Sequence, residues 1–278
     1  MSFSLILATL GQRPQEIERF LKSVAAQSAK DIQLIIVDQS ETGICEKFEK
    51  EHLSLNIDYI RTNEKGLSKA RNLGLKYVKN TFVGFPDDDC WYPNGLLSKV
   101  KKIFDQTNCE IVTTAIVDPD LNYAPITKFL QYAQFLNLKT VWHGGAAAGL
   151  FARANISKDL LFDESLGLGA NSIYGSGEET DFLIRALKSS FKIFFDSELH
   201  VYHPHKQVTF DKTTKQRTMS YGAGLGRVLR KNKFPIFDII KMFLRPLGGV
   251  FIYTCLLNFK KANLFYASLK GRIRGYFL

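Results

Sequence analysis

The chain has 278 residues, of which 45% are hydrophobic, 13% aromatic and 23% charged. This balance is typical of a folded globular protein and excludes disordered, collagen-like and other low-complexity classes. Its four cysteines are scattered without any C-x-x-C spacing, which indicates neither a zinc site nor a disulfide framework and favours a reduced, cytoplasmic setting. The longest apolar run near the C-terminus, residues 246–257, is shorter than the ~20 residues that cross a bilayer, so we expect a soluble or peripheral protein.

The formal charge of +10 is unevenly distributed along the chain. Residues 206–278 hold 15 Lys and Arg against two Asp, a local net charge of +13, which leaves −3 for residues 1–205. A nearly neutral body with a basic, aromatic C-terminal region predicts an anionic partner, either membrane phospholipid or nucleic acid.

In chain order, short β-rich runs alternate with helical patterns through the first half. Strands are predicted at residues 3–9, 32–38, 58–62 and 82–85, and helices at 15–27, 66–78 and 93–105, the last with Pro93 at its start. Such alternation is typical of an α/β fold, in which crossover helices connect the strands of a mostly parallel central sheet.

Polar residues follow three of these strands. Thr9 ends the first, Asp38 ends the second, and Asp87-Asp88-Asp89 comes directly after the fourth. In open α/β sheets the ligand binds beyond the carboxyl ends of the strands. Three consecutive carboxylates offer the hard oxygen ligands that Mn²⁺ or Mg²⁺ prefers, although a solvated acidic turn or a helix cap would use the same residues.

The second half is less regular. A glycine-rich loop leading into a strand is predicted at residues 143–153, a loop opening a helix at 175–190, and a histidine-bearing strand end at 200–206. Residues 216–278 have a basic, amphipathic helical pattern that we expect to be broken at Pro235, Pro246 and Gly248-Gly249. We therefore predict two domains, 1–206 as an α/β domain that would hold the strand-end site and 207–278 as a helical basic extension.

Two further groups could take part in chemistry. His203 and His205 lie two apart, so on a strand their side chains point the same way and could complete a metal site, with His203 preferred; each could equally be structural. Glu178, Glu179 and Asp181 fall in the first turn of a predicted helix, where they could cap the helix or supply a general base.

Several nucleotide and nucleophile motifs are missing from the sequence. It contains no G-x-x-x-x-G-K-[ST] phosphate loop and no G-x-S-x-G elbow. Gly222-x-Gly224-x-Gly226 follows no predicted strand, so it is not a dinucleotide fingerprint.

Taken together, these residues resemble the family-2 inverting glycosyltransferases with a GT-A fold, over about residues 3–205. The resemblance is carried by the segments "LILATLGQRPQEIERFLKSVAAQ", "LIIVDQS", "GLSKARNLGL", "FPDDDCWYP" and "GEETDFLIRAL". The acidic triplet and the "GLSKARN" helix are its specific parts.

The resemblance also implies roles for the candidate residues. Thr9 and Asp38 would contact the base and ribose of a nucleotide, and Arg71 would lie near the base or diphosphate. Asp87 and Asp88 would face the ribose and metal waters, Asp89 would bind the metal, with Asp87 and His203 as further ligands, and Glu179 would be the catalytic base. The sequence departs from the family at Asp38-Gln39, where an Asp pair is common, and at Glu178-Glu179, where Glu-Asp is common, which leaves Asp181 as the fallback base.

The expected activity follows from the resemblance. It is a metal-dependent (Mn²⁺ or Mg²⁺), inverting hexosyltransferase that moves a sugar from a nucleotide-diphosphate sugar to a hydroxyl of a saccharide or polyprenol-linked acceptor, in bacterial surface polysaccharide synthesis. We expect it on the cytoplasmic face of the cell membrane, in peripheral contact with anionic lipid. The alternatives are a nucleic-acid-binding protein, disfavoured because the tail's aromatics alternate with Leu, Ile and Val, and an inactive sugar-nucleotide binder. The tail's apolar positions could instead pack on the catalytic domain or form a homodimer contact.

Overall fold

The computed structural model describes residues 2–29, 31–158, 160–205 and 209–278, so the domain boundary expected near residue 206 lies outside the described residues. The chain divides into two compact units. We call them the sheet unit (Met1–Lys65, Lys69–Leu161 and Phe182–His205) and the helical unit (Gly66–Ser68, Phe162–Asp181 and Lys206–Leu278). Residues 162–181, which precede and open the helix that carries the candidate base, thus group with the C-terminal helices.

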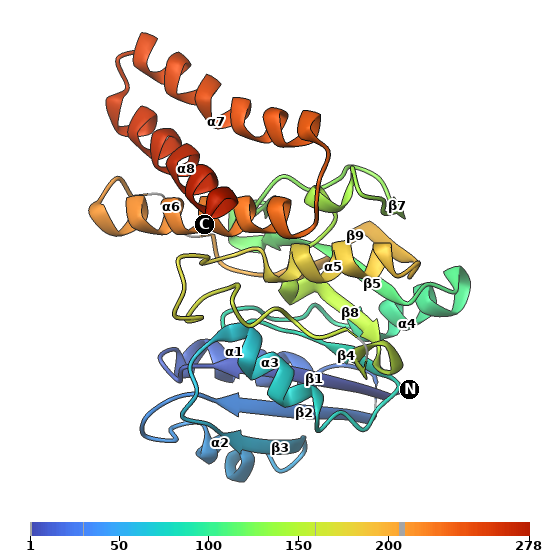
Figure 1. Ribbon diagram of the computed structural model, residues 1–278. Helices are drawn as coiled ribbons and strands as arrows, with labels where there is room; N and C mark the ends of the chain where they lie inside the picture. The colour runs from blue at the N-terminus through green and yellow to red at the C-terminus, as the bar shows by residue number, and fades with distance from the viewer. Residues whose placement is uncertain (1, 30, 159, 206–208) are drawn as a thin grey trace. The chain divides into compact units, whose positions relative to one another are not determined.

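The sheet unit is built on one sheet with the strand order β3-β2-β1-β4-β8-β5-β9-β7 (Figure 1). Neighbouring strands are parallel from β3 to β4 and again between β5 and β9, whereas β8 is antiparallel to both β4 and β5. This arrangement confirms the α/β class and the mostly parallel sheet. The strands are β1 (Ser2–Thr9), β2 (Asp31–Asp38), β3 (Asn56–Arg61), β4 (Phe82–Gly84), β5 (Ile111–Asp118), β6 (Ala124–Pro125, paired with β5), β7 (Gln134–Phe135), β8 (Leu150–Arg153) and β9 (Ile193–Tyr202).

Helices cover both faces of the sheet, and β1 shows this, since alternate residues of a strand point to opposite faces. Leu5 and Leu7 share a buried cluster with the apolar faces of α1 and α4. Ile6 points the other way, against Gly74 of α3, where a Cβ would lie 2.5 Å from the Ile6 side chain. The helices are α1 (Pro14–Ala25), α2 (Glu46–Glu51), α3 (Leu67–Leu75), α4 (Leu96–Thr107) and α5 (Glu178–Lys188), with short 3-10 turns at Pro119–Leu121, Val141–His143, Ala147–Gly149 and Ala154–Lys158.

The predicted start of α4 at Pro93 is wrong by three residues. Gly95 has φ 75° and precedes the first helical residue, Leu96. A left-handed residue cannot continue a right-handed helix, so residues 93–95 form a turn instead.

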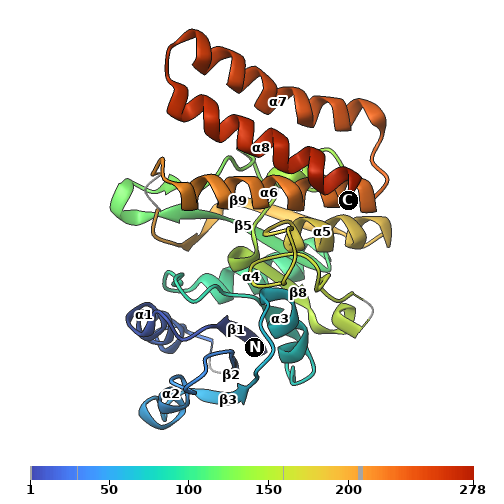
Figure 2. The same cartoon turned by 60° about the vertical axis from the view of Figure 1, so that its left-hand side comes forward.

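The helical unit contains α6 (Lys212–Lys231), α7 (Ile236–Cys255) and α8 (Phe259–Phe277), and α8 lies between the other two (Figures 1 and 2). The backbones of α6 and α8 approach unusually closely. A Cβ on Gly275 would lie 1.8 Å from the Ala223 carbonyl oxygen, and one on Gly271 would lie 2.0 Å from that of Met219. Gly271 and Gly275 of α8 therefore serve helix packing, as in small-x-x-x-small contacts.

The expected helix breaks at Pro246 and Gly248-Gly249 are wrong, since all three residues lie inside α7. Proline has no N–H, so the carbonyl of Met242 loses its partner four residues on. The Arg272 guanidinium of α8 donates to that carbonyl instead. Gly249 packs against the Phe265 ring, where a Cβ would lie 2.3 Å away. Pro235 does separate two helices, as predicted, and is the N-cap residue of α7.

Within the described part of the chain, no helix is both long and apolar enough to cross a membrane.

Candidate active site

The sheet brings the predicted strand-end residues of the sheet unit together. Thr9 and Asp38 are register partners at the ends of β1 and β2. Thr9 donates its hydroxyl to Asp88 Oδ2 at 2.7 Å, which joins the end of β1 to the acidic triplet after β4. A backbone bridge between Trp91 and Tyr202 holds the segment after the triplet beside the end of β9. Residues far apart in sequence therefore meet at one edge of the sheet.

Asp87, Asp89 and His203 form a cluster with the chemistry of a metal site. One ligand atom from each lies within 4.8 Å of the others, and His203 Nε2 is 2.9 Å from Asp89 Oδ1. Two carboxylates and an imidazole suit Mn²⁺, and the carboxylates alone suit Mg²⁺. The residues present therefore fit the expected divalent ion. His205, the other candidate histidine, is not part of this cluster. Its side chain is exposed, and its backbone N–H donates to Asp118 Oδ2 at 2.6 Å.

Two arginines face the triplet. Arg71, on α3, is fully buried, and its Nη2 lies 2.9 Å from Asp87 Oδ1. Arg13, just before α1, places Nη1 2.9 Å from Asp88 Oδ1 and also bonds Asp89 Oδ2. Our sequence reasoning missed Arg13. The available signal was a cationic residue in the short segment between the first predicted strand and helix, at the sheet edge where the carboxylates were expected.

Burial and neighbouring charge set the proton affinities of this cluster. Burial raises the pKa of Asp88, and the charges of Asp89 and Asp87 add to the rise, against hydrogen bonding from Thr9 and the charge of Arg13. Burial acts to lower the pKa of His203, but the hydrogen bond and charge of Asp89, with the charge of Asp87 and a hydrogen bond to the Pro204 carbonyl, outweigh it and raise that pKa. The imidazole is therefore held as a partner of Asp89.

Asp38 is fully buried and organises the loop that follows β2. Its carboxylate accepts from the backbone N–H of Ser40 at 2.7 Å and of Cys45 at 3.1 Å, and from the Tyr59 hydroxyl at 3.1 Å. Burial acts to raise the pKa of Asp38, but hydrogen bonds from the side chain and backbone of Ser40, from Cys45 and from Tyr59 together outweigh it and lower the pKa. The residue thus stays ionised while it shapes the turn of residues 40–45.

The three acidic candidates at the start of α5 have different surroundings within the helical unit. Asp181 is fully buried and accepts from Lys231 Nζ at 2.8 Å and Asn232 Nδ2 at 2.9 Å, so its contacts are those of a structural residue. Glu178 is buried, with its carboxylate 3.1 Å from the position that a Cβ on Gly167 would occupy. Glu179 is the half-buried member of the three.

The loop that leads into α5 is packed tightly on α6. Ser176 donates its hydroxyl to the Tyr221 carbonyl at 3.1 Å. A Cβ on Gly224 would lie 2.1 Å from the Ser176 carbonyl oxygen, and one on Gly177 would lie 2.9 Å from the Val228 side chain. Gly177 also has φ 93°, a conformation that favours glycine. Gly224 of α6 therefore makes room for the loop that leads into α5, the helix of the candidate base.

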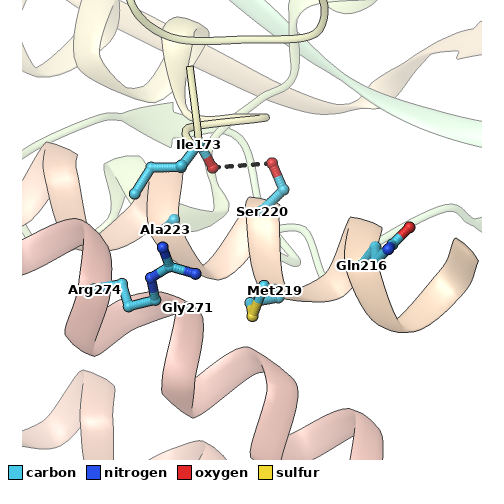
Figure 3. A pocket seen from close by; sticks show the side chains of 7 residues that line it. All are labelled: Ile173, Gln216, Met219, Ser220, Ala223, Gly271 and Arg274. Atoms are coloured by element: carbon cyan, nitrogen blue, oxygen red, sulfur yellow. Dashed lines mark hydrogen bonds between the residues drawn. The ribbon is translucent and has the colours of Figure 1, made fainter. Parts of the chain in front are cut away.

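A separate hollow of about 170 Å³ lies in the helical unit (Figure 3). Ser220 donates a hydrogen bond of 3.0 Å to the Ile173 carbonyl across its wall. The residues that line it include no carboxylate, so they offer no oxygen ligand of that kind to a metal. They include Ile173 of the loop, Gln216, Met219 and Ser220 of α6, and Gly271 and Arg274 of α8.

An α/β sheet with an acidic cluster at its strand ends is the architecture of glycosyltransferases with a GT-A fold, among other classes. Residues 4–159, more than half of the chain, match the model of glycosyl transferase family 2. The chain belongs to this family.

Two relatives agree with this assignment. The "Uncharacterized glycosyltransferase EpsJ" of Bacillus subtilis is 24% identical over 67% of this chain and 56% of its own length. The "Minor teichoic acid biosynthesis protein GgaB" of the same organism is 36% identical over 31% of this chain and 10% of its own length. The chain thus spans less than two thirds of either relative.

Two solved structures share the fold. Residues 1–349 of TarS from S. aureus, in complex with UDP-GlcNAc, superpose with a TM-score of 0.62 at 17% identity and cover 99% of this chain and 92% of that one. The mannosyltransferase PcManGT from Pyrobaculum calidifontis, in complex with GDP-Man and Mn²⁺, gives 0.67 at 11% identity, covering 99% and 87%. At these identities the similarity shows the fold alone.

Proposed function

We propose that this protein is a metal-dependent, inverting hexosyltransferase that uses a nucleotide-diphosphate sugar. The observation that carries the proposal is the cluster of Asp87, Asp89 and His203 at the carboxyl ends of the strands in a family-2 chain. The solved TarS and PcManGT complexes hold UDP-GlcNAc and GDP-Man on the same fold, which supports a sugar nucleotide as the donor.

Asp87, Asp89 and His203 would hold Mn²⁺ or Mg²⁺, which when bound neutralises the donor diphosphate as it departs. Thr9 and Asp38, at the ends of adjacent strands, would contact the base and ribose, with Asp88 beside them. Two arginines that pair with the acidic triplet add positive charge where the diphosphate would bind. They are Arg13 and Arg71.

Glu179 would act as the general base. The acceptor hydroxyl loses its proton to the carboxylate, its oxygen forms a bond to the anomeric carbon, and the bond from that carbon to the diphosphate oxygen breaks, so one direct displacement inverts the anomeric configuration. Asp181 is buried and ion-paired with Lys231, which supports Glu179 over that fallback.

The acceptor that we propose is a saccharide or polyprenol-linked saccharide of bacterial surface polysaccharide synthesis. The name of the GgaB relative places that protein in teichoic acid synthesis, and teichoic acid is a surface polymer. A lipid-linked acceptor would require the enzyme at the cytoplasmic face of the membrane. The net charge of +13 over residues 206–278 supports peripheral contact with anionic lipid there.

Calorimetric titration of UDP-, GDP-, dTDP- and CMP-sugars with and without Mn²⁺ tests the donor site. At least one donor should bind, and bind more tightly with the metal. Asp89→Ala should abolish the metal-dependent part of this binding and all transfer, because a metal ligand is lost. Asp105→Ala, which removes an exposed carboxylate from α4, is the matched control and should leave both unchanged. Unchanged Mn²⁺-dependent affinity in the Asp89 variant would contradict the proposed metal site, and no binding by any donor would contradict the function.

A further inference from the structure

The outer face of α7 presents a row of large apolar side chains to solvent. Phe237 is 81% exposed and Phe251 71%, and the residues between them in the row are about half exposed. We call this row the α7 stripe. It consists of Phe237, Ile240, Leu244, Leu247 and Phe251.

The spacing of the α7 stripe is that of one helix face. Its members follow one another by three or four residues, so at 3.6 residues per turn they fall within a sector of about 80°. The row from Phe237 to Phe251 is about 21 Å long at 1.5 Å per residue. The opposite side of α7, with Ile239, Pro246 and Gly249, is buried within the helical unit. The stripe is therefore additional to the face by which α7 packs.

Charge is arranged around the α7 stripe rather than in it. Lys241 and Arg245 are exposed and lie about 40° to 80° beyond its edge on one side. Exposed Lys233 and Lys260 lie just beyond the two ends of the helix. The single acidic residue of α7, Asp238, lies still farther round the helix and is half-buried. An apolar face bordered by cations is the pattern of helices that lie in a membrane interface.

We infer that the α7 stripe inserts into the headgroup and acyl boundary of an anionic phospholipid bilayer. This inference names the part of the chain that would make the membrane contact of the proposed function. It rests on that function only in explaining why the enzyme would bind a membrane. A second copy of the chain is a less favoured partner for the α7 stripe. A symmetric contact through α7 would bring together two helical regions with a net charge of +13 each, and interface cores are depleted in such charge.

Vesicle co-sedimentation of the full chain tests the inference. Wild type should bind vesicles of phosphatidylglycerol and phosphatidylcholine, with the bound fraction falling as salt rises, and should bind pure phosphatidylcholine far less. The double variant Phe237→Ser/Phe251→Ser should lose at least tenfold in partition coefficient. The matched control Leu53→Ser/Tyr132→Ser removes two side chains that are 87% and 74% exposed in the sheet unit, and it should bind as wild type.

Insertion depth gives a second readout. The tryptophan fluorescence that Phe251→Trp adds should be quenched by brominated lipid, whereas the fluorescence that Leu53→Trp adds should not be quenched. Because both stripe phenylalanines are exposed, the variants should melt as wild type does, which separates lost binding from lost folding.

The outcomes are distinct. No binding by wild type at low salt, or equal binding by the stripe variant, overturns the inference. A wild-type dimer in sedimentation velocity that the stripe substitutions dissociate identifies a second copy as the occupant and also overturns it. None of these assays contains donor or acceptor, so their failure leaves the donor titrations standing, and failure of those titrations leaves the membrane contact standing.

Discussion

At the scale of single residues, the acidic triplet shows how a fold keeps three adjacent carboxylates together. Asp87 pairs with Arg71, Asp88 with Arg13, and Asp89 with both Arg13 and His203. Charges removed from water must be compensated by partners of opposite sign. Arg13 therefore has two opposing effects. It stabilises the carboxylates, and it competes with a metal ion for their oxygens.

The competing role of Arg13 is testable. We expect Arg13→Ala to bind Mn²⁺ more tightly, by about tenfold, because a unit charge is removed from beside Asp88 and Asp89. Free Mn²⁺ measured by electron paramagnetic resonance reports the affinity. Lys99→Ala, which makes the same charge change at an exposed position of α4, should have little effect. Weaker binding by the Arg13 variant would mean that the arginine holds the ligands in place instead.

The proposed role of Glu179 as the general base leads to a second prediction at the scale of single residues. Glu179→Gln keeps the shape of the side chain but cannot take a proton, so donor affinity should persist while turnover falls by ~10² or more. Titration and single-turnover kinetics separate the two effects. Glu198→Gln, an exposed position on β9, is the control. Turnover near the wild-type value would move the role to Glu178.

At the scale of elements, two glycines on helices have opposite surroundings. Gly275 meets the backbone of α6, whereas nothing lies within 4 Å of the position that a Cβ on Gly248 of α7 would occupy. Replacement by alanine should therefore change the free energy of unfolding in opposite directions at the two positions. Gly275→Ala should lower the free energy of unfolding by about 2 kcal/mol or more, because the helices must separate, and Gly248→Ala should raise it by about 0.5 to 1 kcal/mol through helix propensity.

Thermal and urea unfolding of both glycine variants check this pair. A loss of stability in both would show that the conformation of α7 at Gly248, rather than space, requires glycine. Neutrality of Gly275→Ala would contradict the close crossing of α6 and α8.

At the scale of the whole molecule, Lys231 ties distant segments of the helical unit together. Its Nζ lies 2.6 Å from Asp163 Oδ2 and 2.8 Å from Asp181 Oδ2, so the C-terminal end of α6 binds both ends of the 162–181 segment. Burial acts to raise the pKa of Asp163, but hydrogen bonds from Lys231 and Ser165 outweigh it and bring the pKa to about 2. The segment that opens α5 thus depends on the ionised state of Asp163.

The depressed pKa sets the pH window of this contribution. A lowered carboxyl pKa stabilises the fold above the unfolded-state value near 4, and the contribution disappears as the pH falls from about 4 through 2. We expect Asp163→Asn to cost about 1 to 2 kcal/mol at pH 7, with allowance for solvent screening, and to cost progressively less below pH 4. Urea unfolding of both proteins at pH 7, 5, 4 and 3 measures the difference. A difference that does not change with pH would contradict the ionic role.

The sequence by itself determined the features that depend on local pattern. Alternating strand and helix signals predicted the mostly parallel sheet, since the period of apolar residues decides which backbone conformation can bury them. The polar residues at strand ends predicted which side chains would share an edge, because parallel strands place their carboxyl ends together. The acidic triplet and the "GLSKARN" segment carried the family resemblance, which the family match confirms.

The tertiary structure decided what depends on partners distant along the chain. Arg13 beside Asp88, Lys231 beside Asp181, and Arg272 beneath the carbonyl that Pro246 leaves free are contacts that no local pattern encodes. Each links a charged or polar group to whichever segment the fold brings within about 3 Å, and Coulomb and hydrogen-bond energies depend on that distance rather than on sequence separation. For the same reason a proline that predicts a helix break from local geometry is tolerated inside α7, where α8 supplies the missing donor.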